Sequence, residues 1–185
     1  RELAYGLADS KDLPDWAAYG RRSWAELGYR CILPLFDALG QQRSVIATGH
    51  TWAPDAPKSL PPWEPDSASP RLERRRLVYA DRAAQAMLRG DVHSAWWVER
   101  PTLWIAEGPK DFMAVATSTQ GGAAVVGLDS GSWTAGHAER IPHRARVVIA
   151  THADSAGDRY AAGVVETLTG RTDLTVSRYR SREAA

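Results

Sequence analysis

The carboxyl-terminal half of the chain alternates short apolar runs with longer segments of mixed polarity. Short apolar runs bounded by polar residues are typical of strands buried on both faces. The longer segments have the length and polarity of helices that cover a sheet. Strands alternating with helices predict a mostly parallel sheet with right-handed crossovers. The predicted strands span 102–106, 123–126, 146–150 and 174–177, and the predicted helices span 111–118 and 159–168.

The amino-terminal half has more turn residues and shorter β-prone runs. The apolar runs 29–36 and 43–48 flank the turn-like sequence Asp-Ala-Leu-Gly and predict a β-hairpin. Trp16 and Tyr19 stand at helical spacing, which predicts a helix near the amino terminus. Residues 54–70 contain six prolines and predict a long loop, of the kind that is usually functional or connects two lobes.

A second helix is predicted just before the α/β pattern begins. The apolar run 77–79 leads into a helix over 82–88, which Asp81 caps and Gly90 ends. The chain of 185 residues is 44% hydrophobic and 24% charged, which is enough apolar material for a packed core. We therefore predict a small amino-terminal α+β lobe over residues 1–95 and an α/β lobe with a mostly parallel central sheet, flanked by helices, over residues 96–185.

Charge and cysteine content exclude several classes of protein. The 23 Lys and Arg nearly balance the 22 Asp and Glu, although arginines cluster within 71–76 and 178–182, where they can meet phosphates. Cys31 is the only cysteine, which excludes an internal disulfide and a thiolate zinc site. No apolar run approaches the ~20 residues of a membrane span, and no signal-peptide pattern opens the chain. We expect a cytoplasmic protein without a membrane partner.

Acidic residues follow two of the predicted strands. Glu107 ends the first strand and Asp111 lies one helical turn later, whereas His152 and Asp154 follow the third strand. Because neighbouring parallel strands end at the same edge of a sheet, we expect these side chains to converge. Clustered carboxylates bind divalent cations, so the pattern predicts metal-assisted phosphoryl chemistry.

This pair of strand ends resembles a TOPRIM domain, whose motif is Glu-Gly after one strand and Asp-x-Asp-x-x-Gly after another. Three upstream segments are similar to the catalytic core of bacterial-type primases of phages and mobile elements. They are the hairpin at 32–40, the Pro-Lys segment at 56–62 and the run at 77–79, in that order. The resemblance covers roughly residues 25–170, and the chain is interpreted as a catalytic core fragment.

The resemblance implies a DNA primase, a nucleotidyltransferase that makes short RNA primers on a single-stranded DNA template from ribonucleoside triphosphates. It implies Mg²⁺ or Mn²⁺ as cofactor, and a replicative helicase as a partner that binds through domains outside this chain. Glu107 and Asp154 would be catalytic. The expected metal ligands are Glu107, Asp111, His152, Asp154 and Asp158, and the expected nucleotide and DNA contacts are Lys58, Lys110, Arg74, Arg75 and Arg76.

His152 departs from the motif, which has Asp at this position. Magnesium binds imidazole poorly, so His152 either shifts the metal preference toward manganese or zinc, leaves Asp158 as a substitute, or marks reduced activity. The plain alternative is a hydrogen bond to Asp154 or to a phosphate. Two further functions stay open: a TOPRIM nuclease, and a catalytically impaired TOPRIM module that binds nucleic acid or a replication partner.

Three other features have two interpretations each. Asp129 lies either at the edge of the site or in a plain turn. Trp52 and Trp63 are the candidates for base stacking among eight tryptophans, whereas Trp104 is expected to be buried. The basic stretch 177–182 is predicted to be either a tail that meets DNA or a frayed terminus.

Overall fold

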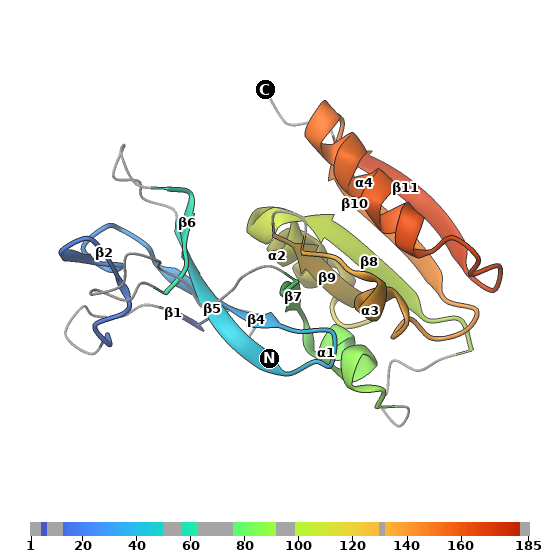
Figure 1. Cartoon of the computed structure of the whole chain (residues 1–185), viewed down its shortest axis with the longest axis horizontal. Helices are drawn as coiled ribbons and strands as arrows, with labels where there is room; N and C mark the ends of the chain where they lie inside the picture. Colours follow the sequence, from blue (N-terminus) through green and yellow to red (C-terminus); the bar gives the residue numbers. More distant parts are fainter. Residues whose placement is uncertain are drawn as a thin grey trace.

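The computed structural model describes residues 5–6, 13–49, 57–62, 76–91, 99–129 and 132–181. Figure 1 shows the order of the helices and strands within these ranges. The strands are β1 (Tyr5–Gly6), β2 (Ala18–Tyr19), β3 (Arg22–Ser23), β4 (Cys31–Phe36), β5 (Gln42–Thr48), β6 (Ser59–Leu60), β7 (Val78–Ala80), β8 (Thr102–Glu107), β9 (Ala124–Leu128), β10 (Arg146–His152) and β11 (Thr175–Ser181). The helices are α1 (Arg82–Arg89), α2 (Gly108–Thr119), α3 (Ala135–Ala138) and α4 (Ser155–Thr167).

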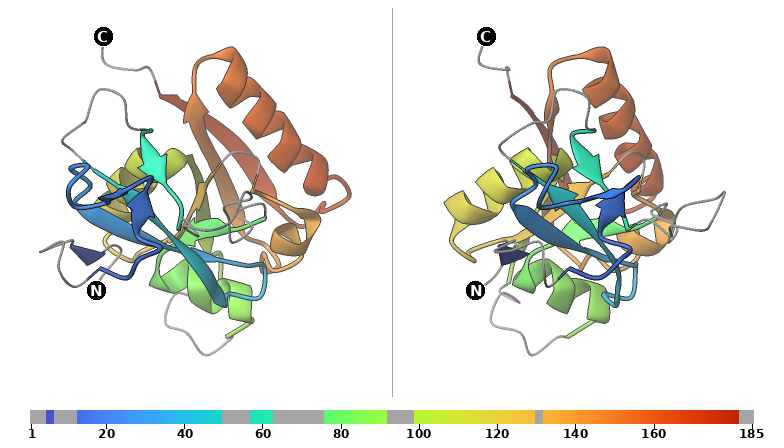
Figure 2. Two further views of the ribbon diagram at one scale, coloured as in Figure 1. Left: turned by 60° about the vertical axis from the view of Figure 1, so that its left-hand side comes forward. Right: turned by 90° about the vertical axis from the view of Figure 1, so that its left-hand side faces the viewer.

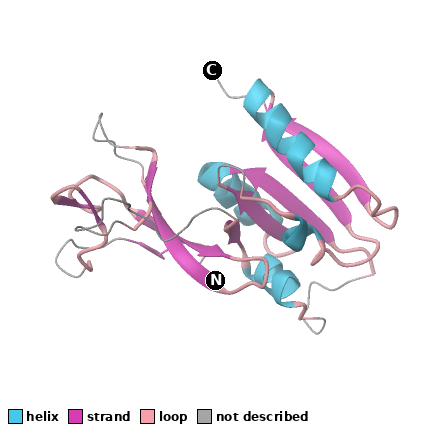
Figure 3. Cartoon of the chain, viewed as in Figure 1, coloured by secondary structure: helices cyan, strands magenta, loops and turns pink. Residues whose placement is uncertain are grey.

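One large sheet organises the molecule. Its path is β11-β10-β8-β9-β7-β4-β5-β6, and β1 pairs with β4 as the ninth strand. Strands β9, β8, β10 and β11 are parallel to one another, whereas the pairs from β9 to β6 are antiparallel. The parallel half and its helices confirm the predicted fold class (Figure 3). The lobe division between residues 95 and 96 stays a prediction, and the sheet continues across it through β7.

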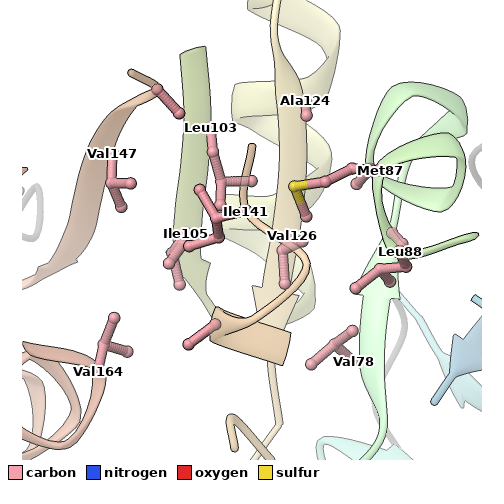
Figure 4. Close-up of a cluster of buried hydrophobic side chains, with 14 of the residues drawn as sticks. Val78, Met87, Leu88, Leu103, Ile105, Ala124, Val126, Ile141, Val147 and Val164 are labelled. Atoms are coloured by element: carbon pink, nitrogen blue, oxygen red, sulfur yellow. The ribbon is translucent and has the colours of Figure 1, made fainter. Parts of the chain in front are cut away.

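Helices pack on both faces of the parallel half (Figure 2). On one face, Met87 of α1 and Val164 of α4 join a buried cluster with Ile105, Val126 and Val147 of the sheet (Figure 4). Each large apolar side chain in such a cluster contributes roughly 1.5–3 kcal/mol through burial. On the other face α2 covers β8 and β9, which explains why the sequences of these two strands are continuous apolar runs.

Helix α2 covers that other face and approaches the sheet closely. The ring of Phe112 in α2 stacks on Tyr79 of β7, with ring centroids 5.6 Å apart. Gly127 of β9 lies beneath it, where an added Cβ would be 2.6 Å from the Cβ of Phe112. The missing side chain at this position therefore permits the close contact between α2 and the sheet.

The carboxylate of Asp81 connects α1 to the parallel half. It accepts hydrogen bonds from the Ala84 N–H at 2.8 Å, which caps α1 as predicted, and from the Val125 N–H of β9 at 3.1 Å. Gly90 ends the helix in the left-handed conformation, also as predicted. Burial raises the pKa of Asp81 to about 6, against the opposing effect of its backbone hydrogen bonds.

The helix predicted near the amino terminus is wrong. Residues 13–30 form turns around the short antiparallel pair of β2 and β3. Gly20 has a φ of 61° between these strands, a conformation that interrupts a right-handed helix. The spacing of Trp16 and Tyr19 has another cause, because Trp16 packs against the ring of buried Trp24 at 71°, while Tyr19 is exposed.

Strand β11 is longer than predicted. Residues 177–181 pair in parallel with β10 and form an edge of the sheet, so the prediction of a free basic tail or frayed end is wrong for them. The alternation of Arg178, Tyr179 and Arg180 places the arginines and the tyrosine on opposite faces. Helix α3 was not predicted, because its four residues are too few for a helical period.

Candidate functional site

The turn from β8 into α2 brings one carboxylate to the carboxyl edge of the sheet. Gly108 has a φ of 75°, which lets the chain leave the strand and begin the helix at once. Glu107 therefore stands at the strand end, and its side chain makes no capping bond to α2. Its Oε2 instead accepts a hydrogen bond of 3.0 Å from the backbone N–H of His152, at the end of β10.

The side chain of His152 reaches the same place. Its Nε2 lies 2.9 Å from Oδ2 of Asp111, in the first turn of α2. Both side chains are about one-third exposed, at 28% for His152 and 33% for Asp111, so solvent and ligands have access. Glu107, Asp111 and His152 thus meet at the ends of β8 and β10, as the parallel topology predicts.

Asp154 has a structural contact of its own. It precedes α4, and its Oδ1 accepts a hydrogen bond of 2.7 Å from the Gly157 N–H, which caps the helix. A Cβ on Gly157 would lie 2.3 Å from the carbonyl oxygen of His152. The spacing Asp-x-x-Gly therefore combines a helix cap with a close backbone approach.

Arginines of β11 bind Asp158. Its Oδ1 accepts hydrogen bonds from Arg178 at 2.6 Å and from Arg180 at 3.3 Å. These two charges lower the pKa of the exposed Asp158 carboxyl, the hydrogen bond from Arg178 most strongly. Arg178 also donates to the Thr151 hydroxyl at 3.0 Å and to the His152 carbonyl at 3.3 Å.

This role of Arg178 was not predicted from the sequence. One guanidinium bonds the last two residues of β10 and Asp158 of α4, so it ties both elements to the edge strand. The signal in the sequence was the alternation of basic residues with Tyr179, which is typical of a strand with two different faces. In the register observed, Arg178 pairs with Ile149 and Arg180 with Thr151.

The residues differ in how well they suit a divalent cation. Glu107, Asp111 and His152 offer two carboxylates and an imidazole, a donor set that suits a borderline cation such as Mn²⁺ better than Mg²⁺. Within the described part of the chain, no three His, Cys, Asp or Glu side chains are arranged as a ready metal site. A cation at this edge would have to replace the hydrogen bond between His152 and Asp111.

Two predicted phosphate contacts are exposed lysines. Lys110 lies in the first turn of α2, next to Asp111. Lys58 directly precedes β6, which pairs with β5. The hydroxyl of Tyr29 donates a hydrogen bond to the carbonyl of Pro57, the neighbour of Lys58, so the backbone that carries this lysine is held in place.

Other predicted residues lie elsewhere. Arg76 is exposed just before β7, with a φ of 71°. Asp129 is in a turn, where it exchanges hydrogen bonds of 2.9 and 3.0 Å with Ser132. Trp104, on β8, was expected to be buried and is half-buried. Arg74, Arg75, Trp52, Trp63 and Arg182 lie outside the described residues.

Comparisons with known proteins agree with this architecture. Residues 104–183 match the family model described as Toprim-like. The chain is similar to a DNA primase domain from Pseudomonas aeruginosa, with 17% identity and a TM-score of 0.55, over 99% of this chain and 50% of that one. It is also similar to the Aquifex aeolicus primase (zinc binding and RNA polymerase domains), with 15% identity and a TM-score of 0.53, over 85% of this chain and 35% of that one.

These findings confirm the predicted resemblance and the fold. The chain spans half the length of the first structure and about a third of the second. A search of curated proteins finds no match. Of the helices in the described ranges, none combines the length and the apolar character needed to cross a bilayer.

Proposed function

Because residues 104–183 form a Toprim-like domain within a primase-type fold, we propose that the chain is the catalytic core of a DNA primase. It would join ribonucleoside triphosphates into short RNA primers on a single-stranded DNA template. The observation that carries this proposal is the convergence of Glu107, Asp111 and His152 at the carboxyl ends of β8 and β10. A replicative helicase would be a partner through other parts of the protein.

A divalent cation, Mn²⁺ or Mg²⁺, is part of the proposal because the donor set suits one. Glu107, Asp111 and His152 would hold it, with Asp154 as a further ligand. Such a cation would offset the charge on the phosphates of the incoming nucleotide. A ligand role for Asp158, also predicted, would require its ion pairs with Arg178 and Arg180 to open.

The protein's own residues would bind and orient the reactants. Glu107 would accept the proton of the attacking hydroxyl, and the bond from the His152 N–H orients its carboxylate. Lys110 and Lys58 would contact phosphates, since both ammonium groups are exposed and Lys110 is next to Asp111. Arg74, Arg75 and Arg76 remain proposed contacts to the template backbone.

One observation supports a second candidate function. His152 stands where the TOPRIM motif has its first Asp, and its ring is already hydrogen-bonded to Asp111. An acidic site with one carboxylate replaced binds magnesium more weakly. A catalytically impaired module that binds nucleic acid or a replication partner would have this arrangement.

The test combines a single-stranded DNA template, labelled ribonucleotides and either Mg²⁺ or Mn²⁺. We expect template-dependent oligoribonucleotides, and a decrease of about 100-fold or more in Glu107→Gln, since the loss of a general base commonly costs this much. Glu166→Gln, an exposed position on α4, is the matched control and should keep full activity. Degradation of the template would indicate a nuclease instead, and binding without any product the impaired module.

His152→Asp tests the metal preference directly. We expect the variant to gain affinity for Mg²⁺ and to lose its preference for Mn²⁺, because an oxygen donor replaces imidazole. Isothermal titration with each ion measures this without any need for turnover. An unchanged ratio of the two affinities would mean that His152 does not contact the cation.

A further inference from the structure

We propose that an apolar hollow beside the candidate site binds a nucleobase by stacking. The hollow has a volume of about 230 Å³ and lies between α2 and the edge strand β11. It is lined by Trp104, Asp111, Ala114, Val115, Ala150 and Tyr179. This proposal rests on the proposed function only in taking nucleic acid as the ligand, and it is independent of whether the chain synthesises primers.

The sheet itself creates the hollow. On this face α2 covers β8 and β9, whereas within the described residues no helix packs over β10 and β11. Ala150 of β10 pairs with Tyr179 of β11 on one side and with Ala106 of β8 on the other, so small side chains lie beside Tyr179. The rings of Trp104 and Tyr179 meet edge to face, with centroids 6.5 Å apart at 70°, and both line the hollow.

The chemistry of the walls favours a flat aromatic ligand. Tyr179 is 57% exposed, so its ring is accessible to a ligand in solution. Ser118 also lines the hollow, but its hydroxyl already donates to the Val115 carbonyl at 2.9 Å. Few groups remain to read the edge of a base, so we expect stacking that tolerates all sequences.

Position and size select a nucleobase among flat ligands. Asp111 belongs both to the rim of the hollow and to the candidate site, where its carboxylate contacts His152. Lys110, exposed and next to Asp111, supplies a positive charge for the attached phosphate. The volume is below the ~300 Å³ at which pockets for drug-sized ligands begin, so it suits one ring system rather than a segment of protein.

The experiment compares two labelled single strands of equal length, one with bases and one abasic, by fluorescence anisotropy without metal or nucleotides. Tyr179→Ala should weaken binding of the strand with bases by roughly 5- to 100-fold, as expected for loss of one stacking partner, and leave the abasic strand unaffected. Tyr179→Phe should retain the affinity because it keeps the ring. Tyr19→Ala, an exposed tyrosine of β2, is the matched control and should change neither.

A filling variant makes the test independent of Tyr179. Ala114 is an exposed position of α2 that lines the hollow, so Ala114→Leu should fold normally and also weaken only the strand with bases. Competition by free ribonucleoside triphosphates distinguishes the base of an incoming nucleotide from a base of the template. An equal loss on both strands, or no loss in either variant, would overturn the proposal. If the unsubstituted protein binds the strand with bases more tightly than the abasic strand but makes no primers, only the proposed function is overturned.

Discussion

The turns after β8 and β10 have similar sequences, but each needs its glycine for a different reason. Both run from a buried strand through an acidic residue and a glycine into a helix. After β8, Gly108 needs its positive φ of 75°, and an added Cβ would have nothing within 4 Å. After β10, Gly157 lies in the first turn of α4, where an added Cβ would collide with the His152 carbonyl at 2.3 Å. One glycine is required for conformation and the other for space.

The acidic residues of the two turns differ in the same way. Glu107 makes no cap to its helix, and its carboxylate faces the neighbouring turn. Asp154 uses one oxygen to cap α4. The comparison teaches that the first turn presents a carboxylate that caps no helix, while the end of β10 supplies the His152 N–H that orients it.

Among these substitutions, Gly157→Ala should reduce the stability of the protein most. The new methyl group would push against the backbone of β10, so we expect a loss of roughly 2–4 kcal/mol in the free energy of unfolding. Urea denaturation, monitored by circular dichroism, measures this loss of stability. Gly163→Ala in the same helix is the control, since an added Cβ there meets nothing within 4 Å and should stabilise by roughly 0.5–1 kcal/mol. Equal effects of the two substitutions would contradict a steric role for Gly157.

Gly108→Ala should have a smaller effect, because only the left-handed backbone is disfavoured. We expect a loss of about 1–2 kcal/mol in the free energy of unfolding. Gly108→Asn should lose less, since Asn tolerates this conformation better than Ala. The two variants are compared by their urea midpoints, and an Asn variant less stable than the Ala variant would show that the turn is limited by space after all.

Asp154→Ala should cost about 1 kcal/mol through loss of the helix cap. Asp154→Asn keeps the capping oxygen and should retain nearly all of the stability while removing the charge. Thermal unfolding of the pair separates the structural role of Asp154 from its proposed catalytic role. If both variants lose the same stability, the charge rather than the cap is what matters.

The sequence predicted the parallel half well because burial on both faces leaves a simple signal. The apolar runs at 102–106 and 146–150 correspond to β8 and β10 within two residues. The amino-terminal region was harder, because the spacing of Trp16 and Tyr19 is compatible with a helix, whereas the ring of Trp16 packs against Trp24, a contact that the spacing does not reveal.

The site was predictable only in part, for a similar reason. Strand ends of a parallel sheet meet at one edge, so the approach of Glu107 to His152 follows from topology. The partners of Asp158 depend on the length and register of β11, which bring Arg178 to its carboxylate. Such long-range pairing has no local signature, and the residue was therefore expected to be an outer metal ligand.

The bond from the Val125 N–H to Asp81 has a consequence for how this fold can be divided. The segment matched by the family model begins at residue 104, after β7 and Asp81. A fragment limited to that segment would expose the whole β9 edge, which now pairs with β7 from Val126 to Leu128. An apolar, unpaired edge is a template for aggregation. We therefore expect a fragment that folds by itself, or that can be transferred to another protein, to include β7 and Asp81 as well as the segment that the family model matches.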